Sequence, residues 1–551
     1  MDSEDTKLKV LILDDERLVR FTIGAYLRAS GYSVTEATTP EEAILKLKRE
    51  EFHAIVSDIV MKEVDGFMFR DLVRTWEKDI PIIFLTSMMN DSGNTFLERV
   101  TEDVHSFYVS KAAPRAVLVA RLNQVVNAYL AELNVRRMEK RLQKNLELAS
   151  FVQKAMLPTW VHIGKYYTYA SCFDPFAKIS GDLYEWYPIK GHSALFIIGD
   201  IAGHGTNAAL AMTAVQAFLK QFSYVEEEDA QRVYRIARSI HDFIQTNLKD
   251  VTYMATTILY VNYEEMYCRY INCGNPEPLC ISSVTGELQK MNPEKRGAMP
   301  LGLLPEAEYH AEDVVEHHFG KEDVFLLSSD GIYDVSSDLD GNELVPADVL
   351  FELFSIVVRE RGNGETLIGA IPYRIISSLE GMGYSHKHDD VSFCVIGANE
   401  NVTGQFLSEV KMYPDMIDEI CHKAKLWIVE NTQDEELAVK VDLLLNEQMM
   451  NIYRHGYNDF DRQHEVSILS MHTEGANLIV TVWDRGAPWR DLMDKSITDI
   501  EKQLDKQNES LADSGRGLAI LRKIAENITI ERFMNLNKTV FYIPMKKGGS
   551  K

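Results

Sequence analysis

The sequence predicts a multidomain protein in which an α/β unit is followed by α+β units. Three observations lead to this prediction. Short apolar runs alternate with amphipathic segments over residues 1–125, a stretch without glycine or proline follows from Val119 to Leu157, and the remainder mixes short β-like runs with helical segments. With 551 residues, the chain has room for three or four domains, at about 150 residues per domain.

The composition excludes several classes of function. The chain is 46% hydrophobic and 26% charged, as is ordinary for globular proteins. No apolar run reaches about 18 residues and the first residues are polar, so neither a membrane span nor a signal peptide is expected. The six cysteines lack C-x-x-C spacing, which indicates reduced thiols in a cytoplasmic protein. The net charge of −25 argues against nucleic acid as a partner, although plain solubility also explains it.

The first domain is expected to be a parallel sheet with helices on both faces, because its apolar runs are short and continuous. Asp14 and Asp15 follow the first run, and Asp58 follows a later one. Ligand sites in such sheets form at the carboxyl ends of the strands, so the three carboxylates should share a cavity with a cation such as Mg²⁺. Thr86 and Lys111 follow later runs and are expected to contact a phosphoryl group on Asp58.

These residues, in this order, resemble response-regulator receiver domains, which have a flavodoxin-like fold. The resemblance covers residues 7–125 and implies that a cognate histidine kinase phosphorylates Asp58. It implies a Mg²⁺ site made by Asp15, Asp58 and the carbonyl of Val60, with Asp14 acting through water. The remaining roles implied by the family are a switch hydroxyl, a switch aromatic and a phosphate-binding cation, which fall on Thr86, Tyr108 and Lys111. The sequence departs from the family at Ala112, where proline is usual.

Residues 126–159 are expected to form a helical or coiled-coil linker. Apolar residues recur near heptad spacing from Leu122 to Leu146, although Val135-Arg136-Arg137 interrupts it, and Pro158 closes the segment. Two interpretations remain open at this point. One is a coiled coil that joins two copies of the chain, and the other is a single helix packed on one domain.

The middle domain, residues 160–398, contains four acidic motifs in order. They are Ser180-Gly181-Asp182, the stretch from Gly199 to Gly205 that includes Asp200, Ser329-Asp330-Gly331, and Asp389-Asp390. An isolated Asp-Gly pair usually marks only a turn. Four such motifs in one domain indicate instead that two divalent cations are held by carboxylates, with a bridging water as the nucleophile for phosphoester hydrolysis.

This pattern resembles the metal-dependent PPM Ser/Thr phosphatases, in particular the bacterial branch of sporulation and stress-response phosphatases. The family fold is a β-sandwich with flanking helices, and residues 153–158 look like the lead-in of that branch. The resemblance implies that Asp200 bridges two Mg²⁺ or Mn²⁺ ions and that the Ile201 carbonyl is a further ligand. Asp330 and Asp389 would complete one metal site, and Asp182 would serve the other; Asp389 is preferred as the ligand over its neighbour.

The last domain, residues 405–548, carries a polar row on a predicted helix. Glu447, Asn451 and His455 recur at steps of four, which places them on one face. An asparagine can hold Mg²⁺ and a glutamate can act as a base. Two glycine-bearing stretches follow, Asp484-Arg485-Gly486 and Gly515-Arg516-Gly517, and they would let the backbone approach a nucleotide.

This combination resembles the GHKL ATPases, whose Bergerat fold is an α/β sandwich. The resemblance implies that Asn451 binds Mg²⁺, Asp484 binds the adenine amino group and Glu447 is the base for an attacking serine hydroxyl. His455 also belongs to the implied ATP site, and three glycines would shape its lid over residues 487–514: Gly486, Gly515 and Gly517. The predicted linker helix contains no acceptor histidine, so the domain resembles the anti-sigma-factor Ser/Thr kinases more than the histidine kinases.

Three functions are compatible with these features. The first is a partner-switching response regulator that dephosphorylates and phosphorylates a STAS-type anti-sigma factor antagonist, under the control of Asp58. The second is a phosphatase whose last domain only binds a sigma factor or anti-sigma factor. The third is a hybrid histidine kinase. The missing acceptor histidine argues against the third, and the presence of both Glu447 and Asn451 argues against pure binding.

Overall fold

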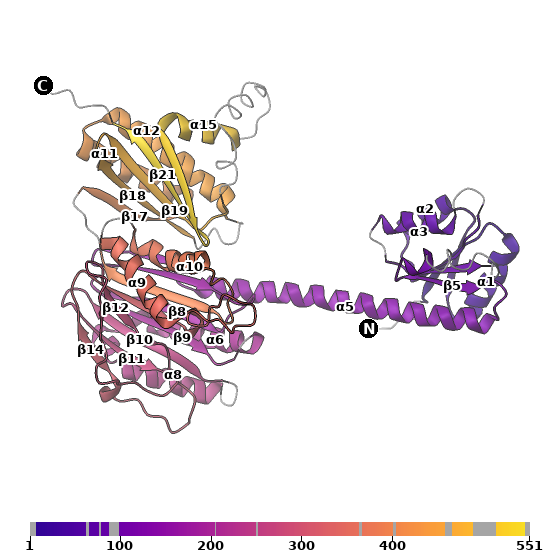
Figure 1. Cartoon of the computed structure of the whole chain (residues 1–551), viewed down its shortest axis with the longest axis horizontal. Helices are drawn as coiled ribbons and strands as arrows, with labels where there is room; N and C mark the ends of the chain where they lie inside the picture. The colour runs from indigo at the N-terminus through magenta and orange to yellow at the C-terminus, as the bar shows by residue number, and fades with distance from the viewer. Residues whose placement is uncertain are drawn as a thin grey trace. The chain divides into compact units, whose positions relative to one another are not determined.

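A computed structural model of the protein describes residues 7–61, 65–76, 79–86, 99–203, 205–248, 252–362, 366–399, 404–457, 465–488 and 514–545 (Figure 1). The chain divides into two compact units, Met1–Asn145 and Leu146–Lys551. Among the described residues, no helix combines the length and the apolar character that a membrane crossing needs.

The first unit is a five-stranded parallel sheet with the strand order β2-β1-β3-β4-β5, which is the flavodoxin-like order. Its strands are β1 (Lys9–Leu13), β2 (Ser33–Ala37), β3 (Ala54–Asp58), β4 (Ile82–Thr86) and β5 (Ser106–Ser110). Its helices include α1 (Arg17–Ala29), α2 (Pro40–Arg49) and α3 (Gly66–Arg74). Separate apolar clusters lie on the two faces of the sheet, so the predicted doubly covered α/β unit is confirmed.

Local sequence explains where these helices begin. The Thr39 hydroxyl accepts a hydrogen bond from the Glu42 N–H, and Pro40 occupies the first turn of α2, where its missing N–H costs nothing. Asp65 caps α3 in the same way by accepting from the Met68 N–H at 2.7 Å. These caps fix where each helix begins after the preceding strand.

Helix α5 runs without interruption over 42 residues, Arg115–Met156. Its first turns bury Leu118, Leu122 and Val126 against the parallel sheet. Farther along, Met138 and Leu142 are 70% and 60% exposed. The last helix of the first domain and the predicted linker are therefore one continuous helix, and part of its apolar side is uncovered in a single copy of the chain.

The first part of the second unit is a sandwich of two antiparallel sheets, with helices on both outer faces. One sheet has the order β14-β11-β10-β9-β8 and the other β13-β12-β15-β16-β7-β6. Aromatic and aliphatic side chains from both sheets fill the space between them. The predicted sandwich with flanking helices is confirmed.

The elements of this sandwich are bounded as follows. The strands are β6 (Val161–Ile163), β7 (Tyr167–Asp174), β8 (Asp182–Lys190), β9 (Ser193–Ile201), β10 (Met254–Asn262), β11 (Tyr267–Cys273), β12 (Leu279–Ser282), β13 (Leu288–Gln289), β14 (Val315–His318), β15 (Asp323–Ser328) and β16 (Val391–Ala398). The helices are α6 (Thr206–Leu219), α7 (Glu227–Ala230), α8 (Val233–Asn247), α9 (Ala347–Gly362) and α10 (Ile371–Gly381).

The last part of the second unit is an antiparallel sheet with the order β17-β18-β19-β21-β20. It consists of β17 (Gln405–Lys411), β18 (Val466–Glu474), β19 (Asn477–Asp484), β20 (Asn527–Phe533) and β21 (Leu536–Pro544), with helices α11 (Pro414–Thr432), α12 (Glu435–Asn451) and α15 (Ser514–Ile524). One face of the sheet packs on these helices. Residues of the other face, including Val466, Ile468 and Trp483, join the buried cluster that contains Trp160 and Tyr373 of the sandwich.

Candidate functional site

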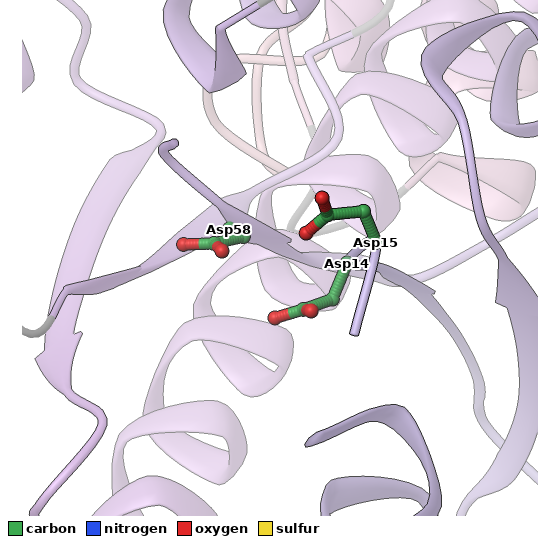
Figure 2. Close-up of side chains that lie close together, drawn as sticks. All are labelled: Asp14, Asp15 and Asp58. Atoms are coloured by element: carbon green, nitrogen blue, oxygen red, sulfur yellow. The ribbon is translucent and has the colours of Figure 1, made fainter. Parts of the chain in front are cut away.

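Three carboxylates gather at the carboxyl ends of β1 and β3 (Figure 2). Ligand atoms of Asp14, Asp15 and Asp58 all lie within 4.8 Å of one another. Their position follows from the parallel register of β1 and β3, which pairs Leu13 with Ser57. The trio predicted from the sequence is thus brought together, and three carboxylates at this spacing suit a hard divalent cation.

The charges around this trio are partly balanced by one lysine. The Lys111 ammonium donates to Asp58 Oδ2 at 2.6 Å and to Asp14 Oδ2 at 3.3 Å. Burial raises the pKa of Asp14 above its ordinary value, while the Glu16 N–H and Lys111 oppose that rise. Burial disfavours the charged form of Lys111, but Asp58 and Asp14 outweigh it and raise the pKa of Lys111. The lysine therefore stays charged beside the predicted phosphorylation site.

The other predicted receiver residues lie on β4 and β5 or in the loop after β3. Thr86 ends β4, next to Asp58 in the sheet, since Asp58 pairs with Leu85. Thr86 is 7% exposed and its carbonyl accepts from the Lys111 N–H at 2.8 Å. Tyr108 lies on β5 and is 40% exposed, and the Val60 side chain is 68% exposed. The predicted hydroxyl at the end of β4 and the lysine that directly follows β5 are thus brought together.

In the sandwich, two of the predicted ligands face each other across adjacent strands. Asp182, the first residue of β8, pairs with Asp200 near the end of β9. Asp182 is 1% exposed, and its Oδ2 has no hydrogen-bond partner among the described residues. Burial raises the pKa of Asp182 well above its ordinary value, and the neighbouring charge of Asp200 adds to the effect. An orphaned, buried carboxylate oxygen of this kind is what a cation site requires.

The other two acidic motifs contribute charge at the same place. Burial raises the pKa of Asp200 to about 8, and repulsion from Asp330 and Asp389 contributes to the rise. Burial also raises the pKa of Asp330. In the described residues, these four carboxylates are less tightly gathered than the receiver trio. Carboxylates that raise one another's pKa in this way are stabilised in their charged form by a divalent cation.

A glycine leaves open the space that a cation would occupy. A Cβ at Gly181 would lie 3.1 Å from Asp200 Oδ1 and 3.1 Å from the Ile201 carbonyl oxygen. These are two of the predicted ligand atoms, so any larger residue at this position would crowd the space between them. Gly331 is required for another reason, because a Cβ there would lie 2.0 Å from the Asp390 carbonyl oxygen. The residues present therefore fit a divalent metal at this position.

The adjacent acids Asp389 and Asp390 have different environments. Both Asp390 carboxylate oxygens accept backbone hydrogen bonds, from Phe176 at 2.7 Å and from Gly181 at 2.8 Å. Asp390 thereby holds the loop that carries Gly181. Asp389 accepts from the Asp390 N–H at 2.8 Å through Oδ1. Because both oxygens of Asp390 are held by backbone N–H groups, Asp390 has a supporting role and Asp389 remains the preferred ligand.

Gln153 of α5 is a second supporting residue whose role was not predicted. Its side-chain amide donates to the Ser180 carbonyl at 2.7 Å, and its carbonyl oxygen accepts from the Ser180 N–H at 3.1 Å. Gln153 is 3% exposed. Ser180 in turn accepts from the Asp182 N–H through its hydroxyl, at 3.0 Å. The end of the long helix is therefore bonded to the segment that carries Asp182. The signal in the sequence was that Gln153 belongs to the lead-in at residues 153–158.

In the last domain, Glu447 and Asn451 lie on the final turns of α12, and a glycine of α15 faces them. A Cβ at Gly517 would lie 2.9 Å from Glu447 Oε2 and 3.2 Å from Asn451 Nδ2. Gly515 lies in the first turn of α15. The α-helix ends at Asn451, and the π-helical turn Ile452–Gly456 follows, so His455 lies on a wider turn and is exposed. The predicted row thus continues past the α-helix in a different geometry.

Asp484 ends β19 in a buried position that suits an adenine amino group. Its Oδ1 accepts from the Gly486 N–H at 2.8 Å and from Asn537 Nδ2 at 2.9 Å. Its Oδ2 is buried and has no partner among the described residues. Burial raises the pKa of Asp484 to about 6. One oxygen is therefore fixed by the protein while the other remains for a donor such as the adenine amino group.

Asn537 was missed by sequence reasoning, because a single asparagine at the start of a strand carries no motif. It faces Asp484 across β19 and β21 and also donates to the Gly486 carbonyl at 3.1 Å. Gly486 itself packs against the turn after α12, since its Cβ would lie 2.9 Å from the Gly456 Cα. The predicted lid, residues 487–514, falls mostly on 489–513, outside the described residues.

Three known families match separate segments of the chain. The response regulator receiver domain matches residues 10–123, stage II sporulation protein E (SpoIIE) matches residues 190–399, and the histidine kinase-like ATPase domain matches residues 411–542. The chain therefore carries a receiver domain, a SpoIIE-type PPM phosphatase domain and a GHKL-like ATPase domain.

Curated relatives resemble separate parts of the chain. Phosphoserine phosphatase RsbP of Bacillus subtilis is 24% identical over 46% of this chain and 58% of its own length. The probable transcriptional regulator ycf27 of Porphyridium aerugineum is 35% identical over 22% of this chain and 48% of its own length. The chain thus spans between about half and three-fifths of these relatives.

Two solved structures resemble larger parts of the chain. The RsbU and RsbW domains of Rv1364c from Mycobacterium tuberculosis are 15% identical and cover 70% of this chain and 97% of their own, with a TM-score of 0.37. The SiaA-PP2C domain of Pseudomonas aeruginosa is 17% identical and covers 47% of this chain and 98% of its own, with a TM-score of 0.38.

Proposed function

We propose that the protein is a cytoplasmic, partner-switching response regulator that removes phosphate from serine or threonine of a protein partner and, through its last domain, phosphorylates such a partner. The partner is proposed to be a STAS-type anti-sigma factor antagonist. Phosphorylation of Asp58 by a cognate histidine kinase would control the balance between the phosphatase and kinase activities. The observation that carries the proposal is the Asp182–Asp200 pair across β8 and β9. The nearby charges of Asp330 and Asp389 raise the pKa of Asp200 further.

In the phosphatase reaction, this chain would hold two Mg²⁺ or Mn²⁺ ions through Asp182, Asp200, Asp330, Asp389 and the Ile201 carbonyl. The ions would supply the activation of a water for attack on the phosphoester. The residues around them set the position of the ligands: Asp390 holds the loop of Gly181, and Gln153 holds Ser180. Gly181 leaves space beside the Asp200 carboxylate and the Ile201 carbonyl.

In the kinase reaction, Asp484 would accept a hydrogen bond from the adenine amino group through its free Oδ2. Asn451 would hold Mg²⁺, and Glu447 would take the proton of the attacking serine hydroxyl as the γ-phosphoryl group leaves ADP. Gly517 packs on both of these side chains, so its segment can approach them closely.

Control by Asp58 is proposed to pass through α5. Phosphorylation adds charge beside Lys111 and Thr86 and should alter the edge of the sheet that carries Tyr108. Helix α5 begins in the receiver and ends with Gln153 bonded to Ser180. A shift or a rotation of the helix, or its pairing with a second copy, would therefore act on the segment that carries Asp182.

The phosphatase assignment is tested with a phosphoserine-bearing STAS protein and Mn²⁺. We expect steady release of inorganic phosphate by the wild type and none by Asp200→Ala, with both proteins melting cooperatively. Asp242→Ala, on the exposed side of α8, is a matched control that should keep full activity. Turnover by Asp200→Ala in the presence of metal would contradict the two-metal assignment.

The kinase assignment is tested by transfer of label from ATP to the same protein in its unphosphorylated form. Asn451→Ala should lose ATP binding, whereas Glu447→Gln should bind ATP and transfer slowly. If the wild type binds ATP but labels no partner and instead forms a stable complex with a sigma or anti-sigma factor, the last domain is a binding module.

A further inference from the structure

Arg485 lies between two residues of the nucleotide site, but its side chain points to the phosphatase domain. Asp484 ends β19 with its side chain in the buried nucleotide site, and Gly486 packs against the turn after α12. Arg485 directly follows the strand, and its contacts with Tyr373 and Trp160 place its side chain on the other side of the sheet. That side is the one packed on the phosphatase domain.

The guanidinium of Arg485 is held by both domains. Within the ATPase domain, Nε and Nη2 donate to the two carboxylate oxygens of Glu465, at 3.1 and 2.6 Å. From the phosphatase domain, the Tyr373 hydroxyl accepts from Nη1 at 3.4 Å, and the Trp160 ring centroid lies 5.6 Å from the guanidinium carbon. A forked guanidinium that also lies near an aromatic ring is fixed in position and orientation.

The two aromatic residues are themselves held firmly. Their rings meet edge to face at 5.6 Å, and the Trp160 indole N–H donates to the Val466 carbonyl of the ATPase domain at 2.8 Å. The Tyr373 hydroxyl donates to the Ser171 carbonyl on β7 at 3.0 Å. Both side chains are at most 1% exposed. The support of Arg485 therefore belongs to the rigid core of the phosphatase domain.

We propose that Arg485 is a positioning residue through which the phosphatase domain sets the affinity of the ATPase domain for ATP. The inference rests on the proposed ATP binding of the last domain. The backbone from Asp484 to Gly486 is short and runs directly through Arg485, so a displacement of this side chain moves the adenine-binding carboxylate and the glycine. A cleft of about 550 Å³ borders Arg485, Trp160 and Gly486, which leaves room for such a displacement.

The same contacts lead toward the phosphatase site. Ser171 pairs with Cys394 of β16, and the chain enters β16 directly from Asp389 and Asp390. Coupling free energies are reciprocal, so a phosphatase domain that supports the ATP site is itself affected when ATP binds. This arrangement would let one protein adjust its two opposing activities against each other.

The test is the affinity of the full-length protein for ATP·Mg²⁺, measured by calorimetry. Tyr373→Phe removes only the hydroxyl that meets Arg485 and Ser171. Its matched control is Tyr309→Phe, another fully buried tyrosine of the phosphatase domain, whose hydroxyl bonds to His241 and to the Met299 carbonyl. We expect ATP binding to weaken about fivefold or more in Tyr373→Phe, at the lower end of typical couplings, and to stay within about twofold in the control.

Arg485→Lys keeps the charge and loses the fork, and its matched control is Arg361→Lys, a buried arginine that bonds to the Ala398 carbonyl. The double variant Tyr373→Phe/Arg485→Lys should bind ATP no more weakly than Arg485→Lys alone, because the change at Arg485 already disrupts the contact through which Tyr373 is proposed to act. If the two changes only damaged the fold, their effects on ATP affinity would add in the double variant, and the control variants would also bind ATP more weakly. Trp160→Phe replaces Tyr373→Phe if the latter does not fold.

The outcomes separate this inference from the proposed function. If the wild type binds no ATP, the nucleotide part of the proposed function fails and the inference falls with it. If the wild type binds ATP and the Tyr373 and Tyr309 variants bind it equally well, the proposed function stands and the positioning role of Arg485 is wrong.

Discussion

Gln153 and Ser180 are joined by two hydrogen bonds, one in each direction, at 2.7 and 3.1 Å. This pair fastens the end of a 42-residue helix to the segment that carries a predicted metal ligand. A side-chain amide suits this position because it carries both a donor and an acceptor. It therefore bonds both the carbonyl and the N–H of the buried Ser180 backbone, which would otherwise lack these partners.

Gln153→Leu should therefore lower the affinity of the phosphatase domain for Mn²⁺. The leucine fills the same space but leaves the Ser180 N–H and carbonyl without these bonds, so Asp182 is less well placed. Loss of a residue that orients metal ligands typically costs about 10- to 100-fold in affinity or activity. The measurement is the Mn²⁺ concentration at half-maximal phosphatase rate, with Gln143→Leu on an exposed turn of the same helix as control. Equal Mn²⁺ requirements in both variants would argue against the role of Gln153.

ATP binding should weaken as the pH falls through about 6. Burial raises the pKa of Asp484 to about 6, so this carboxyl is ionised and able to accept from adenine above that pH and becomes protonated below it. Affinity should be flat above neutrality and fall by up to about tenfold per pH unit below 6. Calorimetry from pH 5 to 8 on the wild type and Asp484→Asn checks this. The phosphates of ATP titrate with both proteins, so the same pH profile for both would contradict the assignment.

The exposed apolar residues of α5 should pair two copies of the chain. Val135, Met138 and Leu142 are 54%, 70% and 60% exposed in a single copy, and Met138 and Leu142 fall at heptad spacing. The double variant Met138→Glu/Leu142→Glu should sediment as a monomer at concentrations where the wild type is a dimer. Gln143→Glu, at a neighbouring exposed position, adds a charge outside the heptad positions and should not change the mass. A monomeric wild type would favour the single packed helix.

Sequence reasoning located the elements whose chemistry is local. The carboxylates at strand ends, such as Asp14 and Asp58, follow from the strand pattern, because parallel strands bring their carboxyl ends to one edge. The glycines at 181 and 517 were recognised by their neighbours in the chain, although what their missing Cβ atoms would touch became clear only in three dimensions.

What escaped prediction depends on partners far apart in the chain. Asn537 lies opposite Asp484 only because β19 and β21 pair. Gln153 and Asp390 act on a loop that neither of them neighbours in sequence. The π-helical turn after Asn451, which changes the setting of His455, has no simple residue signature. Such contacts depend on sheet register and packing, which periodicity does not specify.

Control of the phosphatase by the receiver is tested by the phosphatase rate of the full-length protein with and without beryllofluoride, for the wild type and for Asp58→Ala. Beryllofluoride mimics the phosphoryl group on Asp58, beside Lys111. We predict that it raises the rate of the wild type and leaves that of Asp58→Ala unchanged. Identical rates in all four conditions would contradict control by the receiver.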